Sequence, residues 1–443
     1  MKIQNLLLVS ASYVFYGWWD WRFLSLIIIS SFVDYFVGIG LGKTENPGKR
    51  KLLLFISVCI NLGLLGIFKY FNFFTESFAH AFTFFGMAID PARLSIVLPV
   101  GISFYTFQTL SYSIDVYNKK ISPTRDVLSF LAFVSFFPQL VAGPIERAIN
   151  LLPQFFKKRQ FLYKDMSAGI KLIIFGFFMK LVVADRAAIY VDAVYNNVNN
   201  HEGITFIAAT ILFAFQIYSD FAGYSLIAIG TARLFGFHIM TNFNRPYFAA
   251  SVGDFWKRWH ISLSTWFRDY VYIPLGGNRT STPRWLINIF ITFLVSGLWH
   301  GANWTFVLWG ALNGIYLIAE AVFFKSGRKG ILNVFITFLL ICFSWIFFRA
   351  ANITDAFHIV HSILTKPGKL FIPEGADIVA PVYALLAILL LVIVEFKKEY
   401  FDRAGRLKKI NHSSAKIAYY SIVVFVILYI GVFNSSQFIY FQF

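Results

Sequence analysis

The chain has few charged residues, and this shortage excludes an ordinary soluble protein. Only 14% of its 443 residues are Asp, Glu, Lys or Arg, whereas a soluble globular protein has roughly 25%. Hydrophobic residues make up 58% of the chain and aromatic residues 20%. Apolar segments recur from one end to the other, so we predict an all-α polytopic membrane protein.

Cysteine and polar linkers are scarce as well. The two cysteines, Cys59 and Cys342, lie within apolar runs, where a small buried thiol is ordinary. This excludes a disulfide framework and a cysteine-rich metal site, and no metal ligands are predicted. No long polar linker separates two halves, so residues 1–443 are predicted to form a single integral membrane domain.

Acidic residues are outnumbered by basic ones. The chain has 22 Asp and Glu against 39 Lys and Arg, which gives a net charge of +17. In a soluble protein this excess would suggest nucleic acid as a partner, but the sequence contains no nucleic-acid-binding motif. The basic residues lie in short loops between apolar segments, where they set the orientation of a membrane protein. Membrane lipid is therefore a predicted partner, and nucleic acid is not.

The apolar residues group into about ten segments, some of them predicted to be re-entrant. These segments are residues 5–17, 23–41, 52–74, 94–112, 127–142, 167–183, 204–234, 286–298 with 303–324, 331–348, 378–396 and 417–433. The first is short, and we expect a retained membrane segment rather than a signal peptide. Segment 127–142 has basic residues on both sides, so we expect it to enter the membrane and return to the side it left.

Loop charge predicts which loops face the cytoplasm, because loops rich in Lys and Arg usually stay there. The basic loops are residues 43–51, 119–125, 157–164, 325–329 and 397–416. All fall on one side if segment 127–142 and the pair of segments within 286–324 each return to the side they left. Loops 75–93 and 196–203, which have few basic residues, are then predicted to be external.

Residues 251–268 combine aromatic and basic side chains at helical spacing. The apolar arc of the predicted helix holds Phe255, Trp256, Trp259, Leu263, Trp266 and Phe267. Ser251 stands three residues before Asp254, as at the start of a capped helix. Such an amphipathic helix is typical of a membrane interface. His260 falls at the edge of the arc, either as a functional residue or as a polar residue at the rim of a helix lying on the bilayer.

A second histidine, His300, lies between two charge-poor segments. Residues 286–298 carry no charge, and residues 303–324 carry only Glu320. The Gly301-Ala302 step interrupts them, as in a hairpin or broken helix, which is tolerated at membrane depth only inside protein or beside a wet cavity. An ionisable residue there is a candidate functional site; the alternative is a core histidine bonded to a backbone carbonyl. If the basic loops lie in the cytoplasm, this buried histidine is predicted to lie at the tip of a hairpin that enters the membrane from the cytoplasm.

Four stretches carry a resemblance to a known family. They are SFFPQLVAGPIER at residues 135–147, QIYSDFAGYS at 216–225, NFNRPYFAASVGDFWKRWHISLSTWFRDYVYIPLGGNR at 242–279 and SGLWHGANWTFVLWG at 296–310. With these stretches in order, nearly the whole chain resembles the membrane-bound O-acyltransferase (MBOAT) family. The four stretches most resemble those of the family's bacterial branch, which O-acetylates exported polysaccharides such as alginate. Members of this branch often carry a further apolar segment ahead of the region that resembles the present start.

The resemblance implies the MBOAT fold and a location in the bacterial cytoplasmic (inner) membrane. It implies transfer of acetyl from cytoplasmic acetyl-CoA, with no bound cofactor, toward an exported polysaccharide. It also implies a periplasmic or extracellular acetyltransferase partner of the SGNH-hydrolase type. His300 matches the family's catalytic histidine in the Trp-His-Gly motif, and His260 matches a functional position in the Arg-Trp-His motif. A neutral imidazole suits this chemistry, because the acceptor hydroxyl must lose a proton.

Four further polar residues are candidates for substrate binding. Arg258 and Lys257, together with Arg268, could meet either the phosphates of the acyl donor or lipid head groups. Asn303 could orient an imidazole or cap a helix. Asp220 lies within an apolar span, where an unpaired carboxylate is unfavourable; we expect it to pair with an arginine or to shape a channel.

Two alternatives to polysaccharide acetylation remain open at the level of sequence. One is D-alanyl transfer to teichoic acid from a carrier protein, which is a related acyl transfer. The other is a proton-coupled transporter or channel, because a broken helix with a buried histidine also suits that class. Transporters often contain internal repeats, and none is visible between the two halves of this sequence.

Overall fold

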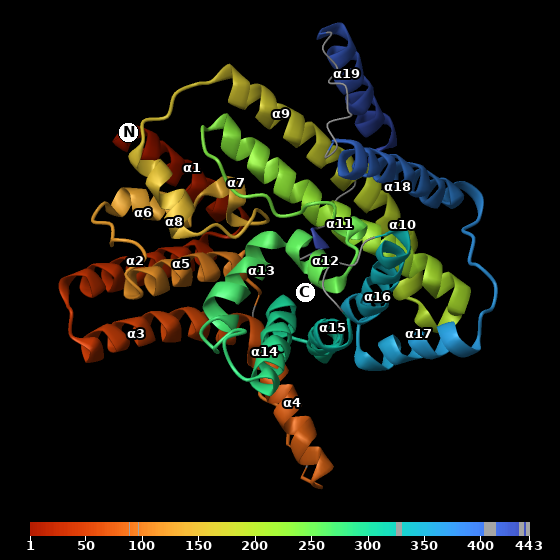
Figure 1. Cartoon of the computed structure of the whole chain (residues 1–443), viewed down its shortest axis with the longest axis horizontal. Helices are drawn as coiled ribbons and strands as arrows, with labels where there is room; N and C mark the ends of the chain where they lie inside the picture. Colours follow the sequence, from red (N-terminus) through yellow and green to blue (C-terminus); the bar gives the residue numbers. More distant parts are fainter. Residues whose placement is uncertain (88, 96, 325–329, 403–412, 434–437, 440–443) are drawn as a thin grey trace. The chain divides into compact units, whose positions relative to one another are not determined.

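The computed structural model describes residues 1–87, 89–95, 97–324, 330–402, 413–433 and 438–439 (Figure 1). Within these residues the regular structure is helical and includes no strand, which confirms the predicted all-α class. The predicted cytoplasmic loop at 325–329 and residues 403–412 of the one at 397–416 lie outside the described residues. The chain forms two compact units. Unit 1 is Met1–Ile170 with Ala228–Met240, and unit 2 is Lys171–Ile227 with Thr241–Phe443. The single domain over 1–443 stays a prediction.

Unit 1 holds the N-terminal helices. They are α1 (Lys2–Trp19), α2 (Trp21–Lys43), α3 (Pro47–Leu65), α4 (Phe71–Phe84), α5 (Ile102–Tyr117), α6 (Val127–Val134), α7 (Phe137–Leu140) and α8 (Ala148–Leu151). A π-helical turn, Gly66–Tyr70, joins α3 to α4. Helix α9 (Tyr163–Phe177) begins in this unit and continues in unit 2.

A buried carboxylate joins three helices of unit 1. Asp34 on α2 is fully buried. It accepts hydrogen bonds from Ser57 Oγ (2.5 Å) and Asn61 Nδ2 (2.7 Å) on α3, and from Ser113 Oγ (2.5 Å) on α5. Buried polar groups need such partners, since an unsatisfied one is costly away from water. The polar residues of these otherwise apolar helices therefore hold α2, α3 and α5 together.

Unit 2 is built from longer helices. After a π-helical turn (Phe178–Ala184), α9 continues into α10 (Asp185–Tyr195). The unit then contains α11 (Gly203–Leu234, whose last turns belong to unit 1), α12 (Val252–Arg258), α13 (Ile261–Phe267), α14 (Thr282–His300), α15 (Trp304–Phe323), α16 (Ile331–Arg349), α17 (Ile353–Thr365), α18 (Val379–Lys397) and α19 (Ser413–Ile430). Gly176 and Gly223 allow α9 and α11 to cross closely, because a Cβ added at Gly176 would lie 2.7 Å from the carbonyl oxygen of Gly223.

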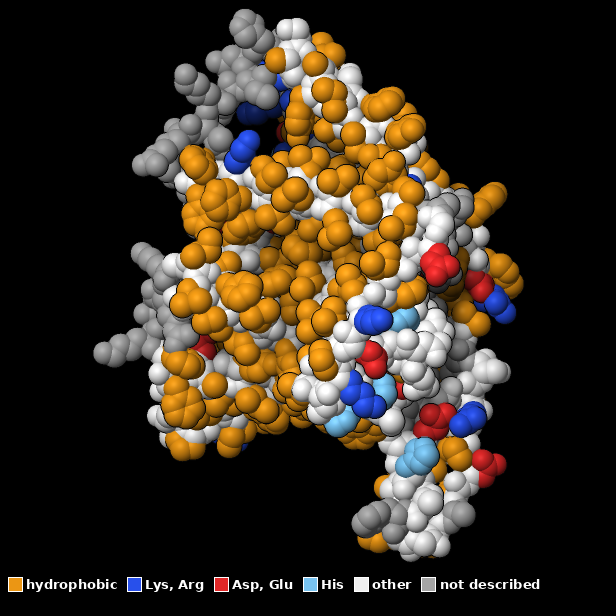
Figure 2. Space-filling view, turned by 90° about the vertical axis from the view of Figure 1, so that its right-hand side faces the viewer, with side chains coloured by type: hydrophobic (Ala, Val, Ile, Leu, Met, Phe, Trp, Pro, Cys, Tyr) orange, Lys and Arg blue, Asp and Glu red, His pale blue; other side chains and the backbone are white. Residues whose placement is uncertain are grey.

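Seven of the described helical stretches are long and apolar enough to cross a membrane. They are Trp21–Lys43, Pro47–Thr83, Tyr163–Tyr195, Gly203–Leu234, Trp304–Phe323, Ile331–Arg349 and Val379–Phe401. Many of their apolar side chains are exposed, among them Leu332 (67%) and Leu386 (58%). Figure 2 shows hydrophobic side chains spread over one face of the molecule. Such a surface suits contact with lipid, and the prediction of a multi-pass membrane protein is confirmed.

Two predicted segments differ from the structure. The segment predicted at 94–112 becomes a helix only from Ile102, because Gly101 before it adopts a left-handed φ of 75° and Pro99 disfavours helix in the residue ahead of it. The segment at 127–142 is divided into α6 and α7, neither of which approaches the ~20 residues needed to cross a bilayer. Its return to the side it left stays a prediction.

Candidate active site

The sequence around His260 forms two short helices, so the prediction of one continuous amphipathic helix is wrong. Ser251 caps α12 as expected, since its Oγ accepts a hydrogen bond from the Asp254 N–H at 3.1 Å. Helix α12 ends at Arg258 and α13 begins at Ile261. Between them His260 has a left-handed φ of 42°, which is uncommon for a residue other than glycine. This break turns His260 into the interior, where it is 1% exposed.

Aromatic side chains and one amide surround His260. Its ring centroid lies 4.6 Å from that of Phe221 and 6.3 Å from that of Phe243. Its Nδ1 lies 3.0 Å from Oδ1 of Asn242. Burial lowers the pKa of His260 to about 3, because a charged imidazolium is unfavourable away from water. His260 is therefore neutral at physiological pH.

His300 is the last residue of α14, at the closed end of a helical hairpin. Helices α14 and α15 pack directly against one another through Gly297 and Gly310, where a Cβ added to either glycine would lie 3.0 Å from the Cα of the other. Residues 301–303 join the two helices. The hairpin predicted from the Gly301-Ala302 step is confirmed, and the side from which it enters the membrane stays a prediction. His300 is 3% exposed.

The structure brings the two predicted histidines together. Their ring centroids are 6.4 Å apart. Two imidazoles joined by a direct hydrogen bond of ~3 Å have centroids no more than about 5.5 Å apart, so the rings are neighbours without a direct bond between them. Trp309 and Phe348 also pack on His300, at 5.0 and 5.4 Å between centroids.

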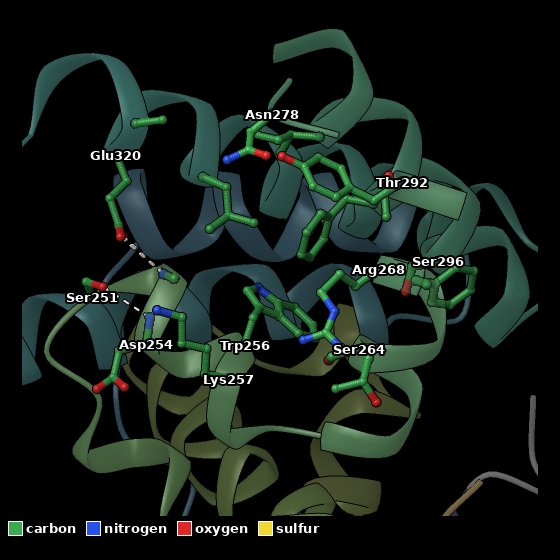
Figure 3. A pocket seen from close by; sticks show the side chains of 18 of the residues that line it. Ser251, Asp254, Trp256, Lys257, Ser264, Arg268, Asn278, Thr292, Ser296 and Glu320 are labelled. Atoms are coloured by element: carbon green, nitrogen blue, oxygen red, sulfur yellow. Dashed lines mark hydrogen bonds between the residues drawn. The ribbon is translucent and has the colours of Figure 1, made fainter. Parts of the chain in front are cut away.

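A large cavity lies beside this pair, between the segment holding α12 and α13 and the hairpin of α14 and α15 (Figure 3). Its volume is about 1120 Å³, at the upper end for small-molecule sites. Its polar lining includes Lys257, Arg268, Glu320, Thr292 and Ser296. Aromatic rings separate it from the histidine: Trp256 lines the cavity and stands 5.7 Å from Trp309, which contacts His300.

A smaller cavity of about 530 Å³ lies at the closed end of the same hairpin. It is lined by Ala302 and Asn303 of the connection, by Phe306 and by the ion pair of Arg349 with Asp192. The ring of Phe306 is 4.9 Å from that of Phe348, which packs on His300. Along the hairpin, His300 therefore lies between the large cavity and the small one.

The predicted substrate-binding residues fall into different environments. Lys257 lines the large cavity, as does Arg268. Arg258 instead forms ion pairs with Asp254 (3.0 Å) and Glu399 (3.1 Å) and is not among the lining residues. These acidic partners neutralise it, which disfavours contact of Arg258 with donor phosphates.

Asn303 acts as a helix cap, which was one of its two predicted roles. Its Oδ1 accepts a hydrogen bond from the Thr305 N–H at 3.0 Å, and its Nδ2 donates to the carbonyl oxygen of Ala351 at 3.0 Å. It also lines the small cavity. Because these hydrogen bonds of Asn303 go to backbone groups, the structure supports capping rather than orientation of an imidazole.

Asp220 pairs with a lysine, and the expected arginine partner is wrong. Lys180 Nζ lies 2.7 Å from Asp220 Oδ1 and 2.7 Å from Asp185 Oδ1. Asp220 Oδ2 also accepts a hydrogen bond from the Ile439 N–H at 2.8 Å. Lys180 and Asp185 were not predicted from the sequence, although they are ionisable residues in an apolar stretch, which is the same signal that singled out Asp220.

In the described part of the chain, no group of three or more His, Cys, Asp and Glu side chains is arranged so that it could hold a metal ion.

Asn242, which contacts His260, was not predicted from the sequence. It stands at the start of the third matching stretch, NFNRPY, but an amide in a loop gives no chemical signal by itself.

The chain matches the model of the membrane-bound O-acyltransferase family over residues 14–348. It therefore belongs to this family and is a multi-pass membrane O-acyltransferase. This assignment decides against the alternative of a transporter or channel.

The chain is also similar to individual relatives whose names give an activity. The chain is 41% identical over 371 residues to a Pseudomonas aeruginosa protein named probable alginate O-acetylase AlgI, covering 82% of this chain and 70% of that one. It is 35% identical over 401 residues to the peptidoglycan O-acetyltransferase of Helicobacter pylori, covering 82% and 74%. It is 27% identical over 273 residues to the teichoic acid D-alanyltransferase of Bacillus subtilis, covering 56% and 68%.

Proposed function

We propose that this acyltransferase takes acetyl from cytoplasmic acetyl-CoA and passes it across the bacterial inner membrane for O-acetylation of an exported, alginate-like polysaccharide. The observation that carries the proposal is the position of His300, buried beside His260 between two cavities on one hairpin. The names of the relatives from Pseudomonas aeruginosa and Helicobacter pylori support acetyl as the group and a polymer as the acceptor. D-alanyl transfer has weaker support, because its relatives match less of the chain.

The large cavity is the proposed donor site. Acetyl-CoA carries several phosphates, and Lys257 and Arg268 place cationic groups in the lining, where Arg268 also pairs with Asp269 at 2.6 Å. Hydrogen bonds from such groups to phosphate are among the strong ones in proteins. The cavity reaches from Glu320 near the end of α15 to Ser296, one turn before His300. We propose that a donor bound there extends its thioester toward the histidine pair past Trp256 and Trp309, which separate the cavity from His300.

His300 is the proposed general base. It takes the proton from the acceptor hydroxyl as the hydroxyl oxygen attacks the thioester carbonyl. The bond from carbon to sulfur then breaks, and the proton passes to the leaving thiolate of coenzyme A. A histidine suits both halves of this exchange, because it titrates near neutrality. His260, whose ring centroid lies 6.4 Å from that of His300, is proposed to position the reacting groups.

The small cavity is the proposed acceptor side. Its lining by Asp192, Asn196, Asn303 and Arg349 is polar, which suits a hydroxyl-bearing group. The acceptor there is proposed to be the polymer or a periplasmic or extracellular partner of the SGNH-hydrolase type, which would complete the transfer.

Binding of acetyl-CoA tests this proposal directly. Purified protein in lipid nanodiscs should bind acetyl-CoA, and Lys257→Glu combined with Arg268→Glu should weaken binding at least tenfold by reversing two charges in the cavity. The matched control reverses two exposed lysines elsewhere, Lys49→Glu with Lys51→Glu, and should bind as the unmodified protein does. Equal binding by the cavity variant and the control would reject the large cavity as the donor site.

A further inference from the structure

The loop that carries Asn242 is tied to the break that carries His260. The Ile261 N–H donates to the carbonyl oxygen of Asn242 at 2.9 Å, and the Asn244 N–H donates to the carbonyl oxygen of Arg258 at 2.9 Å. Asn242 is 1% exposed. Its side chain is therefore held against the imidazole by backbone bonds on both sides of the left-handed residue.

The orientation of the Asn242 amide follows from its neighbours. The backbone N–H of Ser262 points at Oδ1 of Asn242 from 3.3 Å. A backbone N–H can only donate, so the atom it meets must be the amide oxygen. The amide nitrogen, Nδ2, then donates to Ser225 Oγ at 3.1 Å. Exchanging the two amide atoms would set two donors against each other in a buried site, so the hydrogen-bond partners fix the orientation of the amide.

The same oxygen faces His260 Nδ1 at 3.0 Å. An oxygen that has no hydrogen can only accept, so His260 must donate from Nδ1. The other neutral tautomer would place two lone pairs against each other at this distance, in a buried site where no water replaces the lost bond. We propose that Asn242 is a positioning residue that holds His260 in the tautomer with its proton on Nδ1 and its lone pair on Nε2.

This tautomer defines what His260 can do. A neutral imidazole whose Nδ1–H is engaged by Asn242 accepts a hydrogen bond at Nε2 and cannot donate one there. Within the proposed function, on which this consequence rests, His260 therefore presents only a hydrogen-bond acceptor to the reacting groups, while the single proton of the acceptor hydroxyl goes to His300. His260 does not donate to the thioester carbonyl.

Nitrogen NMR tests the tautomer without any activity measurement. Protein labelled with ¹⁵N-histidine in nanodiscs should give one neutral imidazole signal, absent from His260→Gln, with protonated Nδ1 and unprotonated Nε2. Asn242→Ala should shift that residue toward the Nε2–H form. A wild-type signal with protonated Nε2, or an unchanged Nδ1–H form in Asn242→Ala, would overturn the proposal.

The pH at which His260 takes up a proton supplies a second readout that a purely structural role would not move. Asn242→Asp keeps the accepting oxygen but adds a negative charge, which favours the imidazolium. Ring contacts to the imidazole come from Phe221, Phe243, Trp299 and His300, and Ser262 Oγ lies 3.4 Å from Nδ1; of these groups only His300 is ionisable. The pKa of His260, followed by its ¹⁵N signals against pH, should therefore rise by about one to three pH units.

The matched control is Asn352→Asp, which makes the same change at the exposed cap of α17 and should leave the pKa of His260 in place. An unchanged pKa of His260 in Asn242→Asp would overturn the positioning role. If the unmodified protein transfers no acetyl, the proposed function fails, whereas the NMR measurement still decides the tautomer.

Discussion

At the scale of the residue, His300 is buried and lies between two cavities along the hairpin. It is 3% exposed, and the rings of Trp256 and Trp309 stand between it and the large cavity. The described residues around it are mainly aromatic, with Trp299, Trp309 and Phe348 in ring contact. Such a wall excludes water from a reaction in which hydrolysis of the thioester would compete.

His300→Gln should therefore nearly abolish polymer O-acetylation. Glutamine keeps hydrogen bonding but cannot accept the proton, and losing a general base costs about two to four powers of ten in rate. The measurement is acetyl content of exported polymer, with membrane levels of the protein checked by immunoblot. His361→Gln, an exposed histidine on α17, is the control and should acetylate normally. Normal acetylation by His300→Gln would make His300 a packing residue.

The buried charges around Lys180 form the second group at this scale. Lys180 forms ion pairs with two carboxylates, so removing the lysine leaves both Asp185 and Asp220 without this cation. Removing Asp220 alone leaves Lys180 paired with Asp185. The two deletions should therefore differ in cost, although they break the same contact.

Lys180→Met should lower stability by about 3–5 kcal/mol, the usual cost of breaking a buried ion pair, and Asp220→Asn should cost less. Thermal unfolding followed by tryptophan fluorescence measures the order. Lys171→Met, on the exposed side of the same helix, should change little. Equal loss in Lys180→Met and Lys171→Met would show that the network contributes nothing to stability.

At the scale of the element, two helix pairs depend on glycine at their crossing points. Gly297 and Gly310 bring α14 and α15 close enough to hold His300 at a sharp end of the hairpin. Small residues serve this purpose in membranes, because helices there gain by close packing rather than by escape from water.

Gly310→Ala should distort the hairpin, because its Cβ would meet backbone atoms of α14, including Gly297 Cα at 3.0 Å. Gly314→Ala, one turn later, meets side-chain atoms of Phe290 and Phe293 at 3.3 and 3.4 Å and should be tolerated. Acetylation and melting temperature of the two variants give the comparison. We expect Gly310→Ala to lose both, and equal behaviour of the pair would reject the crossing as a constraint on His300.

At the scale of the whole molecule, the loop charges predict the orientation in the membrane. Loop 397–416 should be cytoplasmic and loop 196–203 external, and the large cavity should then open toward the donor. Single cysteines at Ser414 and Asn199 test this after Cys59, which is exposed, is replaced by serine. An impermeant thiol reagent should label the cysteine at 199 from outside and the one at 414 only after the membrane is opened. Labelling of both from outside would contradict the topology.

The sequence by itself determined the class of protein, because composition and the length of apolar runs decide which solvent a chain can face. It also singled out His260 and His300, since an ionisable residue among apolar neighbours is visible without coordinates. Only the tertiary structure decided the break that buries His260, the 6.4 Å between the two rings and the pairing of Asp220 with Lys180. These features depend on contacts between residues about 20 to 40 positions apart. The spacing of residues along the sequence does not show which distant side chains come into contact.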